Sequence, residues 1–406
     1  MFILQVFNEY RSRFNGEEAV VKQIDALLRK HGHETYLWTR SSQDIENSLT
    51  GKMKAFFSGI YDQASHDEML KMIDIHQPDV LHVHNVYPLF SPSILVAAKK
   101  RNVPVVMSLH NQNLTCPKSD HLYKGKVCER CFGGKEYNCV LRNCRENIIE
   151  SIGYAARSSL AYQQGWFRNN VTLFLAMTNF AQKRLAKAGY PDDRIVVLPN
   201  MVDIPESSCD PSQGDYIAFA GRLSTEKGIE TLLNAAKSVP EAQIHLAGNG
   251  PLEEQLKAIA PPNVVFRGRL DRQQMLAFYR NARALVLPSI CFEMCPLVIL
   301  EAMAMGLPVI ASQTGGLGEL VDDGETGFLF ERGNSGELAH RLRQLWNGPA
   351  LCNRMGQKGR IKAIREYSET VFTDRLFSYY EQARTLVGLP AKPAEVNEKE
   401  LVTLNS

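Results

Sequence analysis

Short apolar segments alternate with stretches of helical spacing along most of this chain of 406 residues. In the first half, apolar runs at 1–7, 79–84 and 103–109 have the length and composition of buried strands, and helical spacing is clear at 17–31. Short strands that alternate with helices of about 10–15 residues are typical of βαβ units, in which helices cover both faces of a parallel sheet. The alternation therefore predicts an α/β fold with doubly wound parallel sheets.

The alternation occurs twice, and a polar segment separates the two series. Residues 201–215 are rich in turn-forming residues and have no apolar repeat, which is typical of an interdomain linker. A chain of this length is also too long for one ordinary core, so two domains of roughly 200 residues each are expected. The expected parts, in chain order, are a Rossmann-like N-terminal domain at 1–200, the linker, a Rossmann-like C-terminal domain at 216–368, a helix at 369–387 that completes the N-terminal domain, and a disordered tail at 388–406.

The net charge of +2 is unevenly distributed along the sequence. Residues 1–200 contain 25 basic and 19 acidic residues, a net +6, whereas residues 201–406 contain 21 and 25, a net −4. A basic N-terminal half can face a phosphorylated or membrane-borne acceptor, although an ordinary solvated surface explains the same excess. No nucleic-acid partner is expected.

The chain contains no apolar run long enough for a membrane-spanning helix. The apolar start of the sequence is too short for the core of a signal peptide, and no basic segment precedes it. We therefore expect a cytoplasmic protein, with peripheral contact to the inner membrane face through the N-terminal domain as an option.

Ligands of doubly wound sheets bind at the carboxyl ends of strands, on the loops that lead into helices. The first such loop of the second half, GRLSTEKG, contains Arg222 and Lys227. Both side chains can reach one diphosphate, the arginine as a planar fork and the lysine as a point charge. The alternative is that they are surface charges that pair with Glu226.

A second strand-to-helix loop, AGNGP, contains Gly248 and Gly250. Glycines allow a backbone to approach a ligand closely, and a tight turn explains them equally well. This loop alone therefore does not decide between a binding role and a structural one.

The third loop leads from Glu293 into a strongly apolar segment that contains Glu301. Pro296 suits the first turn of a helix. The backbone N–H groups of Leu297 and Val298 then lie at a helix N-terminus, where phosphate groups bind. Glu301 is either a solvated residue or, because its neighbours are apolar, a buried carboxylate that needs a partner.

Together these segments resemble the retaining glycosyltransferases of family 4, whose GT-B fold consists of two Rossmann-like domains that face each other across a cleft. Glu293 and Glu301 match the E-x7-E motif of that family. The match extends over nearly the whole chain before the tail. Its segments are GRLSTEKG, HLAGNGP, FEMCPLVILEAMAMGLPVIAS and GGLGELVDDGETGFLF in the second half, and FNGEEAV, PDVLHVHN and PVVMSLHN in the first.

The resemblance implies that the C-terminal domain binds a nucleotide diphosphate sugar. Arg222 and Lys227 would bind the diphosphate. Glu301 would bind the ribose, and Glu293 would contact the transferring sugar. The predicted donor-binding set also includes Gly16, Gly248, Gly250, Leu297 and Val298.

The N-terminal domain is implied to bind the acceptor. Gly16, in the loop after the first strand, would let this domain approach the donor, and His110, at the end of a strand, would lie near the reacting carbon. The alternative for His110 is a hydrogen-bonded histidine without a catalytic role. Many members have a glycine where this chain has Asn15 or Pro296, so the donor sugar cannot be copied from relatives.

The reaction implied is transfer with retention at the anomeric carbon, and the candidate catalytic residues are Glu293, His110, Arg222 and Lys227. No metal or other cofactor is required, because Arg222, Lys227 and the helix N-terminus can stabilise the leaving diphosphate. A UDP-sugar is the first choice of donor, with GDP- and ADP-sugars as alternatives, and the acceptor is a glycan, a lipid-linked molecule or a small molecule. A front-side displacement is preferred because no second carboxylate is placed as a nucleophile.

A polar insertion at 111–147 interrupts the first series and contains five of the nine cysteines. A disulfide framework is not expected in a cytosolic chain. A CxxC element within such a cluster is typical of a structural zinc site, although free buried cysteines are also common. The insertion is similar to one in related glycosyltransferases. The best match to that insertion is Cys116, Cys128, Cys131 and Cys144, with Cys139 left over.

Other classes of protein are compatible with parts of this pattern. A GT-B sugar-nucleotide epimerase would share the fold and the diphosphate site, and it would form product without an acceptor. A non-catalytic nucleotide-sugar binding module would keep Arg222, Lys227 and Glu301 but would not need Glu293. An NAD-dependent dehydrogenase is disfavoured because no GxGxxG follows the first strand.

Overall fold

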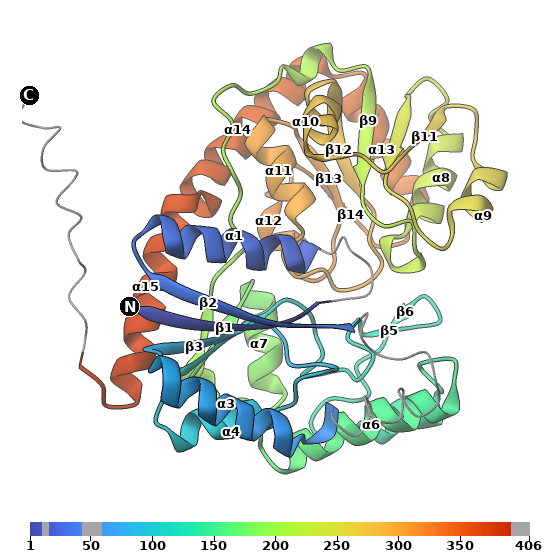
Figure 1. Cartoon of the computed structure of the whole chain (residues 1–406). Coiled ribbons are helices and arrows are strands. Elements are labelled where there is room, and N and C mark those ends of the chain that lie inside the picture. The colour runs from blue at the N-terminus through green and yellow to red at the C-terminus, as the bar shows by residue number, and fades with distance from the viewer. Residues whose placement is uncertain (10–15, 43–58, 391–406) are drawn as a thin grey trace, which may run out of the picture.

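The computed structural model describes residues 1–9, 16–42 and 59–390. They form two domains, each built on a parallel sheet of six strands, and Figure 1 shows the N-terminal domain below the C-terminal one. The doubly wound α/β fold that the alternation predicts is confirmed. None of the helices in the described ranges is both long and apolar enough to span a membrane.

The N-terminal sheet has the strand order β2-β1-β3-β4-β7-β8, and all its neighbouring strands are parallel. The elements of this domain are β1 (Phe2–Glu9), α1 (Gly16–Lys30), β2 (Glu34–Ser41), α3 (Gln63–His76), β3 (Val80–Val83), α4 (Ser93–Lys100), β4 (Val105–Leu109), β5 (Leu122–Tyr123), β6 (Lys126–Val127), α5 (Tyr137–Leu141), α6 (Ile148–Gln163), β7 (Leu173–Ala176), α7 (Asn179–Lys187) and β8 (Ile195–Val197).

The C-terminal sheet has the order β11-β10-β9-β12-β13-β14, again parallel throughout. The elements of this part of the chain are β9 (Tyr216–Ala220), α8 (Ile229–Lys237), β10 (Ile244–Ala247), α9 (Glu253–Ile259), β11 (Val264–Gly268), α10 (Arg272–Arg280), β12 (Ala282–Leu287), α11 (Leu297–Met305), β13 (Val309–Ser312), α12 (Leu317–Leu320), β14 (Gly327–Phe330), α13 (Ser335–Trp346), α14 (Pro349–Tyr367) and α15 (Glu369–Leu386).

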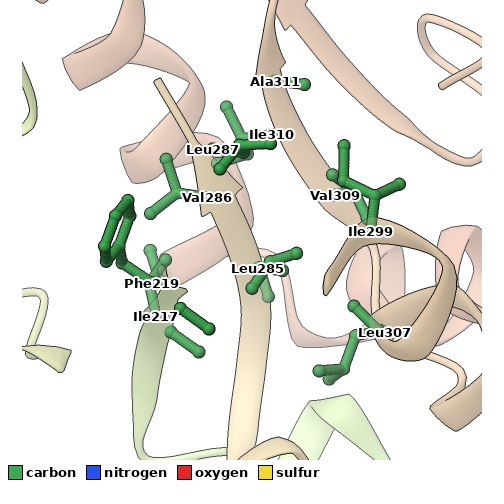
Figure 2. Packing of buried hydrophobic residues seen from close by; sticks show 14 of the residues in the cluster. Ile217, Phe219, Leu285, Val286, Leu287, Ile299, Leu307, Val309, Ile310 and Ala311 are labelled. Atoms are coloured by element: carbon green, nitrogen blue, oxygen red, sulfur yellow. The ribbon is translucent and has the colours of Figure 1, made fainter. Parts of the chain in front are cut away.

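The core of the C-terminal domain surrounds its two central strands, as Figure 2 shows. Ile217 and Phe219 of β9 and Leu285 and Leu287 of β12 are buried in one cluster with Ile299 of α11. Side chains on both faces of these strands are buried because helices cover both faces of a parallel sheet. The strand ends, and the loops that follow them, are therefore held on a rigid base.

The last helix, α15, returns to the N-terminal domain. Its residues Phe372, Leu376 and Tyr380 share a buried cluster with Ile3 of β1 and Val80 of β3. Figure 1 shows α14 and α15 running one after the other along one side of the molecule, from the upper domain to the lower. Helix α15 therefore packs in the N-terminal domain, although it follows the C-terminal domain in the sequence.

The chain crosses between the domains twice, and the two crossings lie side by side. Val202 lies on the first crossing, and Ser368 lies on the second, between α14 and α15. The N–H of Val202 donates to the carbonyl oxygen of Tyr367 at 2.9 Å, and Val202 and Ser368 form an isolated parallel β-bridge. The two connections are thus tied to each other at the boundary.

Two predictions of local structure are wrong. Gly16 does not lie in a loop but is the first residue of α1, while Asn15 is outside the described residues. Pro296 is not inside the first turn of α11 but directly precedes it as the N-cap, with extended backbone. The fixed φ of proline is compatible with this position as well as with the first helical one.

Helix α14 is a third difference, because the hydrophobic pattern does not predict it. Gly356 and Gly359 lower the helix propensity of its centre. In the structure, a Cβ at Gly356 would lie 1.8 Å from the carbonyl oxygen of Gly306 at the end of α11. The glycine that weakens the sequence signal is therefore needed for helix packing.

Candidate active site

The loop after β9 brings Lys227 to the carboxyl end of the C-terminal sheet. Its short 3₁₀ turn, Thr225–Lys227, ends at Gly228, which has a left-handed backbone with φ of 66°. A Cβ at Gly228 would lie 2.0 Å from the carbonyl oxygen of Pro288, so only glycine allows this loop to pack against the loop after β12. The loop that contains Arg222 and Lys227 is therefore in contact with the loop that contains Glu293.

Lys227 and Glu293 meet where these two loops touch. Nζ of Lys227 donates to Oε1 of Glu293 at 2.6 Å, and Oγ of Ser289 donates to the same oxygen at 2.5 Å. The side chains of Lys227 and Glu293 are 23% and 12% exposed. Burial disfavours the lysine cation, but the Glu293 carboxylate outweighs it and raises the pKa of Lys227. A charged lysine is thus held beside the carboxylate.

Arg222 is exposed at the start of the same loop. The described residues provide no ion-pair partner for its guanidinium, and Glu226 instead accepts a hydrogen bond from Oγ of Ser224 at 2.5 Å. The alternative of an ion pair between Arg222 and Glu226 is therefore not what the structure has. The guanidinium can therefore reach an anion without breaking an ion pair to any residue that the structure describes.

Gly248 and Gly250 are explained by contact between two loops. A Cβ at Gly248 would lie 1.9 Å from the carbonyl oxygen of Gly221, and one at Gly250 would lie 2.3 Å from that of Leu223. The N–H of Leu223 also donates to the carbonyl oxygen of Asn249 at 2.9 Å. The glycines thus allow the loop after β10 to support the backbone on both sides of Arg222, and a direct ligand contact remains a prediction.

Helix α11 begins at Leu297 without a side-chain cap. The N–H groups of Leu297 and Val298 precede the first intrahelical hydrogen bond, so they are available to an anion. Glu301, in the second turn, accepts a hydrogen bond from the hydroxyl of Tyr279 at 2.8 Å. Burial raises the pKa of Glu301 above its ordinary value. The partner that a carboxylate among apolar residues requires is therefore a tyrosine on α10.

The loop that contains Glu293 is also held by residues that the sequence did not single out. Gln112 donates to the carbonyl oxygen of Phe292 at 3.0 Å, and Asn200 donates to that of Cys295 at 2.8 Å. Both come from the N-terminal domain. Within the C-terminal domain, a Cβ at Gly315 would lie 2.4 Å from the carbonyl oxygen of Glu293. The glycine pair in GGLGELV was the one sequence signal that could have indicated this contact.

His110 directly follows β4, at the carboxyl end of the N-terminal sheet, and is half-buried. Its Nε2 lies 3.2 Å from Nδ1 of His84. Burial lowers the pKa of His110 to about 3, so the ring is neutral at physiological pH. Because Gln112, two residues later, reaches the residue before Glu293, His110 lies near the contact between the domains.

A cavity of about 600 Å³ is lined by Phe292 together with residues of α7 and of the loop after β13. Its charged lining residues are Lys183, Glu319, Glu331 and Arg332. Glu319 of the C-terminal domain accepts hydrogen bonds from the backbone N–H groups of Asn179 at 2.8 Å and Phe180 at 2.6 Å, at the start of α7. Residues of both domains therefore line the cavity, and a contact between the domains borders it.

The insertion at 111–147 contains a small hairpin, β5–β6, and the short helix α5, and its cysteines are free thiols. The N–H of Cys144 donates to the carbonyl oxygen of Cys139 at 3.0 Å, and Sγ of Cys128 accepts from Arg142 at 3.6 Å. Burial raises the pKa of Cys139 to about 12. Over the described ranges, no group of three or more His, Cys, Asp or Glu side chains is arranged to hold a metal ion. The structural zinc thus stays a prediction, whose ligands would have to converge on binding.

We expect the purified protein to contain one zinc ion per chain, bound by Cys116, Cys128, Cys131 and Cys144. Elemental analysis of the full chain measures this directly. The matched variants are Cys131→Ser, which should lose the metal, and Cys352→Ser, which removes a buried thiol outside the insertion and should keep it. Less than about a tenth of an equivalent in the wild type would contradict the four-thiolate site.

Two family models match the chain. The model described as Glycosyltransferase Family 4 matches residues 14–206, and the model described as Glycosyl transferases group 1 matches residues 203–362. The chain belongs to the family 4 glycosyltransferases. The resemblance seen in the motifs of both halves is thereby confirmed.

This family 4 glycosyltransferase matches curated relatives over parts of their length. It is 34% identical over 157 residues to sulfoquinovosyl transferase SQD2 of Arabidopsis thaliana, and the matched segment covers 38% of this chain and 30% of that protein. It is 32% identical over 204 residues to phosphatidyl-myo-inositol mannosyltransferase of Mycobacterium leprae, which covers 47% of this chain and 54% of that one. The matches span about half the length of these relatives, or less.

The solved structure of HepE from Anabaena, in complex with UDP and glucose, is similar to this family 4 glycosyltransferase over 94% of this chain and all of that one. The TM-score is 0.66 at 18% sequence identity. At this identity the likeness shows a common fold, and the predicted GT-B architecture is confirmed.

Proposed function

We propose that this protein transfers a sugar from a nucleotide diphosphate sugar to an acceptor hydroxyl, with retention at the anomeric carbon and without a metal ion. The observation that carries the proposal is the Lys227–Glu293 contact beside the exposed Arg222. These groups lie on loops after β9 and β12, which are neighbours in the sheet. Two cations next to a carboxylate suit a diphosphate that is joined to a hydroxyl-rich sugar.

The donor-side roles follow from charge and position. As the glycosidic bond breaks, negative charge grows on the diphosphate, and Arg222, Lys227 and the first N–H groups of α11 supply positive charge to it. We expect the carboxylate of Glu301 to accept hydrogen bonds from the ribose hydroxyls. A UDP-sugar is our first choice because the similar HepE structure contains UDP and glucose.

The bond changes balance without a further reactant. The bond between the anomeric carbon and the diphosphate oxygen breaks, and a bond from the acceptor oxygen to that carbon forms on the same face. The proton of the acceptor hydroxyl passes to the departing phosphate oxygen. Glu293 lies where it can accept hydrogen bonds from sugar hydroxyls while its Oε1 remains bonded to Lys227.

Hydrolysis of UDP-, GDP- and ADP-sugars by the full chain tests the donor class. We expect slow release of one nucleoside diphosphate, and NMR of the sugar product should show the anomeric configuration of the donor. Release with inversion would overturn the retaining mechanism. Interconversion of donor sugars in the absence of any acceptor would instead favour the epimerase, and nucleotide-sugar binding without turnover would favour the binding module.

We also propose that the acceptor is lipid-linked and that the protein works at the cytoplasmic face of a membrane. One similar relative is named a phosphatidyl-myo-inositol mannosyltransferase. Helix α6 has an exposed face without charged residues, on which Ile148, Ile149 and Ile152 are at least half exposed. An apolar helix face on a domain with a basic excess is typical of a surface that lies on anionic lipid.

The double variant Ile149→Glu and Ile152→Glu should reduce co-sedimentation with vesicles of phosphatidylglycerol and phosphatidylcholine by at least about tenfold, because it removes apolar burial and adds repulsion. Ile361→Glu, at a similarly exposed isoleucine of α14, is the matched control and should bind like the wild type. Equal binding of the double variant and the wild type would contradict this docking face.

A further inference from the structure

A chain of hydrogen bonds connects the surface of α1 with His110. Asp25 of α1 accepts from Nε2 of Gln5 at 2.9 Å. Oε1 of Gln5 lies 3.1 Å from Nε2 of His84, and Nδ1 of His84 lies 3.2 Å from Nε2 of His110. The four residues come from α1, β1 and the ends of β3 and β4, so the fold alone brings them into one line.

The carboxylate of Asp25, at one end of this series of hydrogen bonds, determines which group donates and which accepts at each step. An ionised carboxylate only accepts hydrogen bonds, so the NH₂ group of Gln5 must face Asp25 and its oxygen must face His84. Since an amide oxygen also only accepts, the proton of His84 must be on Nε2. The hydroxyl of Thr35 supports the same orientation, because it donates to Asp25 at 2.8 Å and accepts from Gln5 at 2.9 Å.

The direction then determines the proton position on His110. A neutral imidazole with its proton on Nε2 has a lone pair on Nδ1, so Nδ1 of His84 is an acceptor and Nε2 of His110 is the donor to it. Burial holds the pKa of His84 and His110 well below the ordinary value, so both rings are neutral. Nδ1 of His110 is therefore unprotonated.

This lone pair is open to a ligand. Within the described residues Nδ1 of His110 has no hydrogen-bond partner, and the residue is only half-buried. In an imidazole ring the two nitrogens point away from each other, so Nδ1 points away from His84. His110 is two positions before Gln112 in the sequence, and Gln112 contacts the loop of Glu293.

We propose that His84 is a positioning residue that, with Gln5 and Asp25, holds His110 as the Nε2–H tautomer, so that its Nδ1 accepts a hydrogen bond from a sugar hydroxyl in the cleft. The identity of the ligand rests on the proposed function, whereas the tautomer does not. A nearby histidine offers a contrast. His82 is bonded to the hydroxyls of Tyr380 and Ser108, and since each hydroxyl can donate or accept, no direction is imposed there.

The variant Asp25→Asn tests the direction of the hydrogen bonds from Asp25 to His110. Nε of Arg29 donates to Oδ2 of Asp25 at 3.0 Å, whereas its Nη2 donates to Oδ1 at the longer distance of 3.4 Å. The shorter bond should hold the new amide oxygen at the Oδ2 position and turn the new NH₂ group toward Gln5. Gln5 would then flip, and His84 and His110 would exchange donor and acceptor roles. Asp25 lies between α1 and the buried Gln5 of β1, and because asparagine has nearly the same shape, the substitution changes a hydrogen-bond acceptor into a donor with little change in packing.

Long-range ¹H–¹⁵N correlation spectra of the full chain labelled at histidine show which ring nitrogen is protonated, and His110→Asn assigns the signal. We expect Nε2–H at His110 in the wild type and Nδ1–H in Asp25→Asn. Glu18→Gln is the matched control, because it also converts an ion-paired carboxylate of α1 into an amide, and it should leave the tautomer unchanged. A wild-type His110 with its proton on Nδ1, or identical tautomers in wild type and Asp25→Asn, would overturn the proposal.

Kinetics with UDP-glucose as the probe tests the role of the lone pair. Asp25→Asn should lower kcat/KM for hydrolysis about tenfold through the lost acceptor, while Glu18→Gln should not. A changed tautomer with unchanged kinetics would contradict the sugar contact. Should UDP-glucose not be a substrate, the spectra still decide the tautomer, so failure of the donor assignment and failure of the hydrogen-bond chain are distinguishable.

Discussion

Replacing either Lys227 or Arg222 with alanine should lower the turnover rate by about 100-fold or more. Each side chain is expected to stabilise the charge that develops on the leaving diphosphate, and loss of one preorganised electrostatic donor typically has an effect of this size. Interactions that strengthen as that charge grows lower the barrier more than they tighten substrate binding. The affinity for UDP, measured by calorimetry, should therefore fall less than kcat.

The structure sharpens this test because the two cations differ in their surroundings. Lys227 is already paired with Glu293, whereas Arg222 has no ion-pair partner among the described residues. Lys227→Ala should therefore also disturb Glu293, and Arg222→Lys should rescue poorly because a point charge cannot replace a planar fork. Lys237→Ala, an exposed lysine at the end of α8, is the control. Near wild-type rates in both alanine variants would place the diphosphate site elsewhere.

Glu301→Ala should weaken UDP binding by about 10- to 100-fold, since hydrogen bonds to a charged group contribute roughly 1.5–3 kcal/mol. The loss should depend on the ribose hydroxyls. In calorimetry the wild type should bind UDP more tightly than its 2′,3′-dideoxy analogue, and the variant should bind both equally. Tyr279→Phe is the matched control, because it removes the hydroxyl partner and leaves the carboxylate.

The same carboxylate predicts a pH dependence. Burial raises the pKa of Glu301, so the group is protonated at a higher pH than an ordinary glutamate. As pH falls through this raised pKa, the acceptor is lost and the affinity for UDP should fall in the wild type but not in Glu301→Ala. In the comparison of the two nucleotides, a Glu301→Ala variant that still binds UDP more tightly than the 2′,3′-dideoxy analogue would refute the ribose assignment.

The parts of the site that follow local rules could be predicted from the sequence. Strand-to-helix loops after buried strands gave the positions of Lys227 and Glu293, and the apolar neighbours of Glu301 indicated that it needs a partner. The identity of that partner could not be predicted, because Tyr279 comes from a different helix. Nor could the pairing of Lys227 with Glu293, which are 66 residues apart and meet only when two loops pack.

Contacts between the domains could not be predicted from the sequence either. Gln112 and Asn200 are ordinary polar residues in the chain, and they contact the loop of Glu293 only because the two domains pack together. The histidines in PDVLHVHN and PVVMSLHN matched the family pattern. The proposed hydrogen-bond direction at His84 and His110, however, depends on Asp25 and Gln5, which lie in other elements.

The paired crossings at Val202 and Ser368 have a mechanical consequence. A single linker would let one domain rotate about several axes relative to the other. Two connections that are joined by a hydrogen bond restrict this rotation to one hinge axis, which passes through them. Rotation about that hinge axis is the motion that leaves both connections unstretched. A rotation that separated the domains would break the hydrogen bond from Gln112, so the loop of Glu293 would lose this support in an open state.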